Sequence, residues 1–151
     1  MIDFRPVLFL AGVLLTTLGL TMLIPAVADA VTDNPDWTVF LASAFVTAFV
    51  GGSLILTNRG VSLALSVRQA FVLTTLSWIV IAAFAALPFS FSNLELDYTD
   101  AFFEAMSGIT TTGSTVIAGL DTAPPGILLW RSLLQWLGGI GIIVMAIAIL
   151  P

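Results

Sequence analysis

The residue types that could do chemistry are few in this sequence and gather in one short stretch. The 151 residues include no His and no Cys, so the sequence holds no imidazole or thiolate for a zinc centre, a nucleophile and base, or a disulfide framework. What remains is oxygen, because Thr110-Thr111-Thr112-Gly113-Ser114 supplies consecutive carbonyl and hydroxyl groups around one glycine. Inward-facing carbonyl oxygens can replace the hydration shell of a cation. We therefore expect an ion-handling protein that is not an enzyme and has no cofactor.

Composition restricts the setting in which such a stretch can work. Hydrophobic residues make up 59% of the chain, against about 45–50% in a soluble domain, and charged residues only 9%, against about 25%. The chain has four basic residues, all of them Arg, and nine acidic residues, so the net charge is −5. No basic surface is available for nucleic acid. The composition predicts a membrane protein with the lipid bilayer as a partner and no nucleic acid.

Four stretches are long and apolar enough to cross a bilayer, which takes about 20 residues as a helix. They are Val7–Ala28, Trp37–Thr57, Ala70–Leu87 and Ile127–Leu150, of which only the last contains a charge, Arg131. We predict helices, because lipid leaves each backbone amide to be satisfied within its own segment. The first stretch also resembles a secretory signal that ends at Ala26-Val27-Ala28, but it exceeds the roughly 7–15 apolar residues of such signals.

Charge placement predicts the orientation. Arg59 and Arg68 lie between the second and third stretches, and the positive-inside rule assigns that connection to the cytoplasm. With four spans, both chain ends are then cytoplasmic. The same choice leaves eight acidic residues outside, where they either concentrate cations in a vestibule or simply keep outer loops polar. They are Asp29, Asp33, Asp36, Glu95, Asp97, Asp100, Glu104 and Asp121.

The connection between the third and fourth stretches holds a shorter helical pattern. Asp100–Ile109 is ten residues long, about 15 Å or half a membrane, and Asp97 can cap its start. The polar stretch follows directly. A half-helix with such a loop is tolerated at membrane depth only where the loop is buried in protein or lines water. We expect a positive φ at Gly113, since carbonyls facing one way need backbone of alternating hand. The alternative is an ordinary polar loop outside the membrane.

Two charged residues and two sets of small residues surround this pattern. Glu104 either lies at membrane depth and holds loop amides or is a carboxylate at the water-exposed rim. We expect Arg131 to pair with Glu104 or Asp121, or to reach the headgroups. Small residues indicate close helix packing, although the glycines of the last stretch could also permit bending. The two sets are Gly138, Gly139 and Gly141, and Ala44, Ala48 and Gly52.

Two long blocks carry a family resemblance. The block DAFFEAMSGITTTGSTV, at 100–116, and the block WRSLLQWLGGIGIIVMAIAILP, at 130–151, closely resemble the first pore repeat of the TrkH family of potassium-uptake proteins in the TrkH/KtrB/HKT superfamily. The resemblance implies an all-α polytopic membrane protein with four transmembrane helices and one re-entrant pore half-helix with a filter loop. It assigns residues 1–60 to a leading helix pair and 61–151 to the first helix, pore loop and helix repeat. It maps a K⁺ filter onto Thr110, Thr111, Thr112, Gly113 and Ser114.

The resemblance also implies a function. Family members take up K⁺ through a channel-like pore in the bacterial plasma (inner) membrane, built from four such repeats in one polypeptide. This chain is then a fragment that supplies one of four filter loops. The partners implied are the remaining repeats, a second copy as a dimer, and a cytosolic nucleotide-binding regulatory subunit. The alternatives are a self-assembling homotetrameric cation channel and a non-conducting membrane scaffold subunit.

Overall fold

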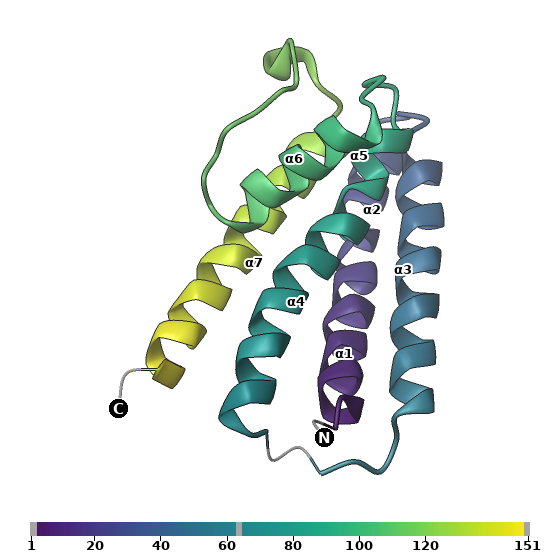
Figure 1. Cartoon of the computed structure of the whole chain (residues 1–151). Coiled ribbons are helices and arrows are strands. Elements are labelled where there is room, and N and C mark those ends of the chain that lie inside the picture. Colours follow the sequence, from purple (N-terminus) through teal and green to yellow (C-terminus); the bar gives the residue numbers. More distant parts are fainter. Residues whose placement is uncertain (1–2, 63–64, 150–151) are drawn as a thin grey trace.

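The computed structural model describes residues 3–62 and 65–149, and all regular structure within them is helical (Figure 1). Four helical segments are long and apolar enough to cross a membrane: Arg5–Val31, Trp37–Thr57, Val67–Phe91 and Pro125–Ile143. The predicted all-α fold with four membrane-length segments is therefore confirmed. The individual elements are α1 (Arg5–Thr21), α2 (Leu23–Val31), α3 (Trp37–Thr57), α4 (Val67–Ala85), α5 (Leu87–Phe91), α6 (Tyr98–Ile109), the 3₁₀ turn η1 (Leu120–Thr122) and α7 (Pro125–Ile149).

Prolines divide two of the four segments. Pro25 lacks an N–H and its ring opposes the carbonyl one turn earlier, and the first segment is broken at Met22 into α1 and α2. The third segment was expected to end at Leu87, and this boundary is wrong. Pro88 instead sits in the first turn of α5, where its missing N–H needs no partner, so helical structure continues to Phe91.

Helices α1 and α3 pack with their backbones almost in contact. A Cβ on Gly19 would lie 2.9 Å from the Ala44 carbonyl and 2.9 Å from the Ala48 amide nitrogen, so no larger residue fits there. The prediction of close packing is confirmed for Ala44 and Ala48 but is wrong for Gly52, because a Cβ there would meet no described atom of another element within 4 Å. Gly51 takes that role, because its face and not that of Gly52 is turned to α1.

A buried tryptophan joins α3 and α4 to α7. Trp130 of α7 is fully buried, and its ring meets Phe40 of α3 edge to face, with centroids 6.3 Å apart. Its indole N–H donates to the Ala85 carbonyl at 3.0 Å. Because one side chain contacts α3 and the end of α4, α7 is held at a defined position against both.

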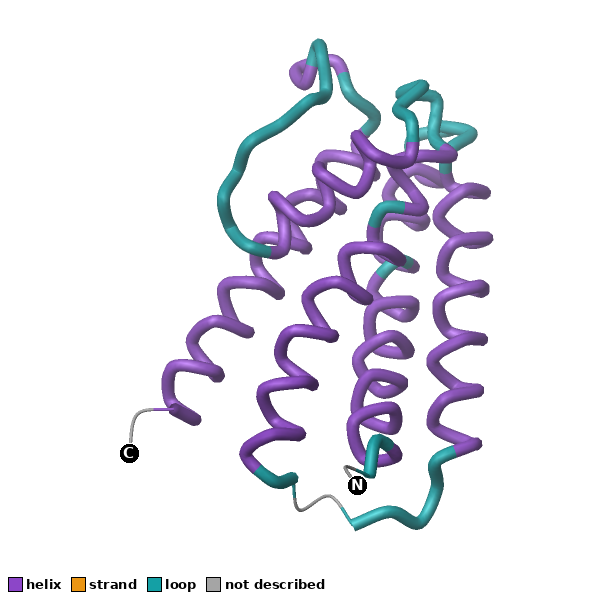
Figure 2. Tube along the Cα trace, in the orientation of Figure 1, coloured by secondary structure: helices purple, strands orange, loops and turns teal. Residues whose placement is uncertain are grey.

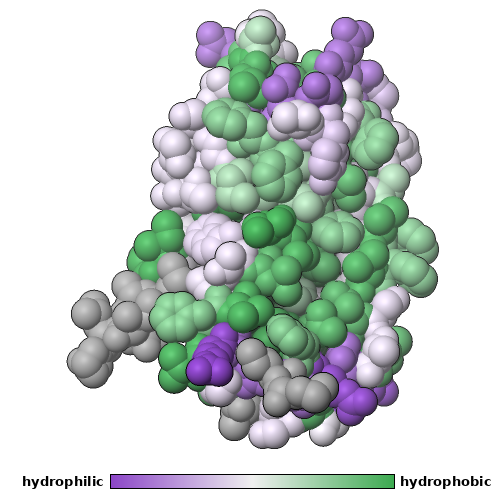
Figure 3. Space-filling model, viewed as in Figure 1, coloured by the Kyte–Doolittle hydropathy of each residue, from purple (hydrophilic) through white to green (hydrophobic). Residues whose placement is uncertain are grey.

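Helix α6 spans only part of the bundle height. It starts at the end opposite both termini and stops about midway, and the following loop returns to the same end before α7 begins (Figures 1 and 2). At 12 residues it is about 18 Å long. The visible surface is largely apolar between two more polar ends (Figure 3). This banded surface, with exposed side chains such as Phe45 and Phe71, is typical of a protein that spans a bilayer.

Candidate ion-binding loop

Helix α6 is placed by its cap and by small residues. The Asp97 carboxylate accepts a hydrogen bond from the Asp100 amide at 2.8 Å, which confirms the predicted cap. At the other end, a Cβ on Gly138 of α7 would overlap the Ile109 carbonyl group. Close packing is thus confirmed for Gly138, whereas a Cβ on Gly139 or Gly141 would meet no described atom within 4 Å. The absence of a side chain at one position lets α7 touch the end of α6.

Helix α6 ends in a common C-terminal capping motif that has an unusual residue at its left-handed position. The Thr111 amide donates to the Gly108 carbonyl at 2.9 Å, and the Thr112 amide to the Ser107 carbonyl at 3.0 Å. These two bonds form a Schellman motif, in which the left-handed residue is most often glycine. Here it is Thr111, with φ of 59°, a conformation strained for a β-branched residue. Sequence reasoning missed it, because a threonine carries no signal for this role.

The backbone of the loop alternates in hand. Thr111 and Gly113 have φ of 59° and 78°, whereas Thr112 and Ser114 lie outside the positive-φ region. The positive φ expected at Gly113 is confirmed. A Cβ there would come no closer than 3.9 Å to a neighbour, the Gln135 side-chain nitrogen. Glycine is therefore needed for the backbone conformation and not for space.

The predicted ligand residues fall into two groups by their hydrogen bonds. The Thr110 hydroxyl donates to the Met106 carbonyl at 2.7 Å, and the Ser114 carbonyl accepts from the Ser107 hydroxyl at 2.7 Å. Within the described part of the chain, no donor reaches the carbonyl oxygens of the three residues between them. Those residues, at 111–113, are also exposed on this chain. Their carbonyls are thus open to a ligand. The Thr110 carbonyl also accepts from no donor among the described residues, but Thr110 is partly buried.

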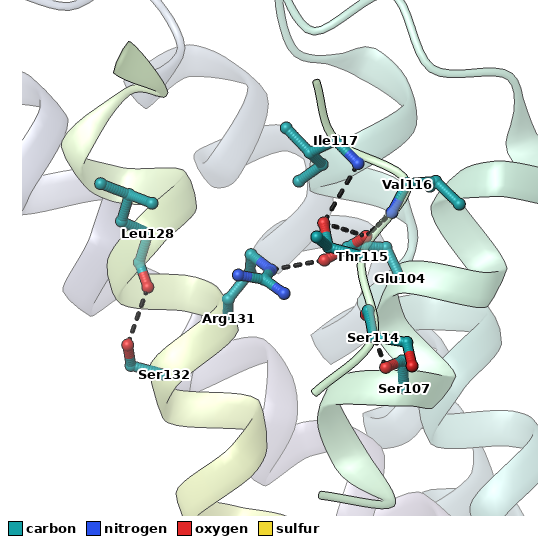
Figure 4. Close-up of polar contacts among 9 residues, drawn as sticks. All are labelled: Glu104, Ser107, Ser114, Thr115, Val116, Ile117, Leu128, Arg131 and Ser132. Carbon is teal, nitrogen blue, oxygen red and sulfur yellow. Dashed lines mark hydrogen bonds and ion pairs between the residues drawn. The ribbon is translucent and has the colours of Figure 1, made fainter. Parts of the chain in front are cut away.

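Glu104 connects α6, the returning part of the loop and α7 (Figure 4). One carboxylate oxygen accepts from the Thr115 hydroxyl and from the Val116 amide, each at 3.0 Å, and the other accepts from the Arg131 guanidinium. Glu104 is 1% exposed. The prediction that it holds a loop amide is confirmed, the rim alternative is wrong, and Arg131 pairs with Glu104 and not with Asp121.

Two further acidic residues are buried, which sequence reasoning missed. Asp29 accepts from the Gly126 amide at 2.6 Å, and Asp36 accepts from the side-chain amide of Asn93 at 2.8 Å and from its backbone amide at 3.3 Å. Burial raises the pKa of Asp36, and the backbone hydrogen bond from Asn93 opposes this rise. With Glu104, three of the eight acidic residues expected outside are thus buried within the helical bundle.

The described residues contain no group of three or more acidic side chains able to hold a metal ion, so the open carbonyls of the loop are the candidate cation ligands.

A family model described as a cation transport protein, TrkH, matches residues 37–151. The chain belongs to the TrkH family. The predicted resemblance is thereby confirmed.

Relatives in this TrkH family match nearly the whole chain. It is 46% identical over 97% of its length to the Trk system potassium uptake protein TrkI of Halomonas elongata, and 42% identical over 98% to TrkH of Escherichia coli strain K12. The crystal structure of the potassium transporter TrkH from Vibrio parahaemolyticus matches 99% of the chain with a TM-score of 0.94 at 41% identity.

The chain spans about a third of the length of these relatives: 30% of the Halomonas protein, 31% of the Escherichia coli protein and 32% of the crystallised Vibrio chain. These lengths do not support the homotetrameric channel, because the relatives carry this region within much longer polypeptides. The family consists of transporters and not of enzymes.

Proposed function

We propose that this chain is the amino-terminal part of a K⁺ uptake transporter and supplies one of the filter loops of its pore. Several curated relatives are named as potassium uptake proteins, and the chain matches about a third of their length. The observation that carries the proposal is the alternating backbone at 111–114, in which three successive exposed residues, 111–113, have carbonyl groups without a donor. Such oxygens suit a cation that has lost its hydration shell.

Within this proposal the five predicted residues do not contribute equally. The carbonyls of Thr111, Thr112 and Gly113 are the principal K⁺ ligands, because nothing else bonds them. Thr110 sits at the inner mouth of the loop, and its hydroxyl already bonds the Met106 carbonyl. Ser114 contributes less, because its carbonyl accepts from Ser107. Helix α6 acts as the pore half-helix, with its negative end directed at the ion path.

The proposed setting is the bacterial inner membrane. Residues 1–60 form the leading helix pair and residues 61–151 the first pore repeat. The start of α1 and the end of α7 lie at the same end of the bundle as the end of α3 and the start of α4, between which Arg59 lies (Figure 1). This supports a cytoplasmic location for both chain ends. Labelling by an impermeant reagent tests this: Cys introduced at Val67 should react only from inside, and Cys at Asp121 only from outside. The reverse pattern contradicts the orientation.

The proposed partners complete the pore and regulate it. The remaining repeats of the same polypeptide supply the other filter loops around the ion, since one loop cannot enclose it. A second copy as a dimer and a cytosolic nucleotide-binding subunit are proposed only from the resemblance to the family.

The test is Gly113→Ala in the complete transporter that carries this chain. Within this chain the added methyl group comes no closer than 3.9 Å to a neighbour, so the effect arises from the positive φ, at about 1 kcal/mol or more of strain. We expect K⁺ uptake to fall, or Na⁺ to compete better, at matched membrane levels. Gly52→Ala is the matched control, because it adds the same group at an open helical position. Unchanged uptake and selectivity in Gly113→Ala contradict the proposal.

A further inference from the structure

Two buried carboxylates flank the turn between α2 and α3: Asp29 lies in the last turn of α2, and Asp36 precedes α3. Asp29 and Asp36 are 0% and 2% exposed. The hydrogen bonds that close the turn include those from the Asn34 amide to the Asp29 carbonyl at 2.9 Å and from the Asp36 amide to the Asn34 side-chain oxygen at 3.0 Å. Neither bond involves a carboxylate oxygen. The two carboxylates therefore serve contacts outside the turn.

Asp29 caps a helix that has no cap of its own. Helix α7 begins at Pro125 and is preceded by Pro124, and neither residue has an N–H or a polar side chain. The first amide in need of an acceptor is that of Gly126, and it donates to Asp29, 97 residues away. A Cβ on Gly126 would overlap the Asp29 carboxylate, so glycine is required for this approach. A carboxylate at this end also interacts favourably with the helix dipole.

Asp36 contacts the residue Asn93, which lies before α6. Its Oδ1 atom accepts from both the backbone amide and the side-chain amide of Asn93, 57 residues away. Asn93 precedes α6, and Gly126 opens α7. The two carboxylates therefore hold both ends of residues 93–126, the segment that contains α6, the candidate ion-binding loop and η1.

These contacts carry a penalty in stability. The second oxygen of each carboxylate, Oδ2, is buried and has no hydrogen-bond partner among the described residues. A buried polar atom without a partner is unfavourable, and a neutral side chain would pack there without it. Placing charges here stabilises the fold poorly but sets the positions of two backbone amides accurately, which favours a positioning role.

We propose that Asp29 and Asp36 form an outer clamp, a pair of positioning residues by which the leading helix pair sets the geometry of the ion-binding loop and hence its ion selectivity. The proposal rests on the proposed function of that loop. Ligand atoms must be held within about 0.5 Å of the productive geometry. Asp29 fixes the start of α7, and one turn later α7 carries Arg131, whose partner Glu104 holds Thr115 and Val116. A displaced helix start is transmitted to the loop along this path.

The experiment measures Rb⁺ and Na⁺ uptake in the complete transporter, at matched membrane levels, for alanine and asparagine variants of both residues. Asp29→Ala and Asp36→Ala remove the acceptors, and we expect the Rb⁺ to Na⁺ ratio to fall by about tenfold, the lower end of what outer-shell partners of ion ligands contribute. Asp29→Asn and Asp36→Asn keep an oxygen acceptor and should restore most of the ratio. A simple loss of folded protein would lower both fluxes together.

Two further variants keep the test decisive. Gly126→Ala pushes the Asp29 carboxylate aside without removing a charge and should lower the ratio as Asp29→Ala does. Thr47→Val is the control, because Thr47 is buried in the leading pair and its hydroxyl bonds only the Ser43 carbonyl and the Met22 sulfur. It should leave the ratio unchanged. An unchanged ratio in inserted Gly126→Ala and in the inserted alanine variants of Asp29 and Asp36, or an equal fall in Thr47→Val, overturns the clamp.

The same assay separates the clamp from the proposed function. If Gly113→Ala lowers the ratio while the alanine variants of Asp29 and Asp36 lower only the total flux, the clamp is wrong and the filter loop stands. If Gly113→Ala leaves both the uptake and the ratio unchanged, the loop is not the filter and both proposals fail.

Discussion

The α1–α3 interface and the α6–loop–α7 region are held together by different forces. Between α1 and α3, glycines let the helix backbones approach, and the side-chain hydroxyls there bond mainly to carbonyls of their own helix. Around the loop, a buried Glu104–Arg131 pair, the Ser107 hydroxyl and a strained Thr111 hold the backbone. Regular helices satisfy their own amides in lipid, whereas an irregular segment must be given partners. The comparison teaches that this chain uses buried charge where its backbone is irregular.

The largest expected effect is on the charged pair. Arg131→Gln leaves the fully buried Glu104 carboxylate without its charged partner, which should lower the free energy of unfolding by about 3 kcal/mol or more. Glu104→Gln leaves the charge of Arg131, which is partly exposed, and should lower it less. The double variant removes both charges and should be more stable than either single variant. Thermal unfolding in detergent checks this. Additive losses would show that the two charges do not depend on each other and would weaken the contrast with α1 and α3.

The next effect separates two adjacent glycines. Gly138→Ala forces α7 away from the Ile109 carbonyl, and we expect a loss of about 1–3 kcal/mol, as for overpacking elsewhere, together with altered ion selectivity. Gly139→Ala is the neighbouring control, since its Cβ meets no described atom. Gly51→Ala, which crowds α1 and α3 instead, should lower stability and leave selectivity unchanged. Equal selectivity in the Gly138 and Gly51 variants would remove the distinction between the two regions.

A smaller effect is expected at Thr111. Thr111→Gly relieves the left-handed strain and should raise stability by about 1 kcal/mol, because glycine is the usual residue at this position of the motif. The freer backbone should also hold the carbonyls less tightly, so Na⁺ should compete better for uptake. Unfolding temperature and competitive uptake together test this. Lower stability in the glycine variant would show that Thr111 is not strained.

The smallest effect concerns Asp36 and pH. Its pKa is raised in the folded protein by burial, so the native state holds the proton more strongly than the unfolded chain does. Stability from this group is therefore present at acidic pH and is lost as pH rises through the folded pKa. Asp36→Asn removes this dependence and keeps an acceptor for Asn93. We expect the unfolding temperature of the wild type, relative to that of the variant, to fall as the pH rises above the ordinary aspartate pKa. A constant difference would contradict the shift.

Several local features could be predicted because their signals are local. The membrane-length stretches follow from hydropathy, the start of α6 from Asp97, and the φ of Gly113 from the demand for alternating backbone. The partner of Arg131 could also be predicted, since few acidic residues were available to pair with it. The strained backbone of Thr111 could not be predicted, because a left-handed threonine has no distinguishing pattern in sequence.

By itself, the sequence determined that the chain is a helical membrane protein with one half-length helix and an oxygen-rich loop, since hydropathy and caps act over a few residues. Only the tertiary structure decided which small residues touch and where the buried carboxylates bind. Gly138 and Gly139 are adjacent and chemically identical, yet only one faces α6. Asp29 and Asp36 looked like loop charges, but their partners lie 97 and 57 residues away. Such contacts depend on how helices pack in space, and no pattern within a few neighbouring residues records that arrangement.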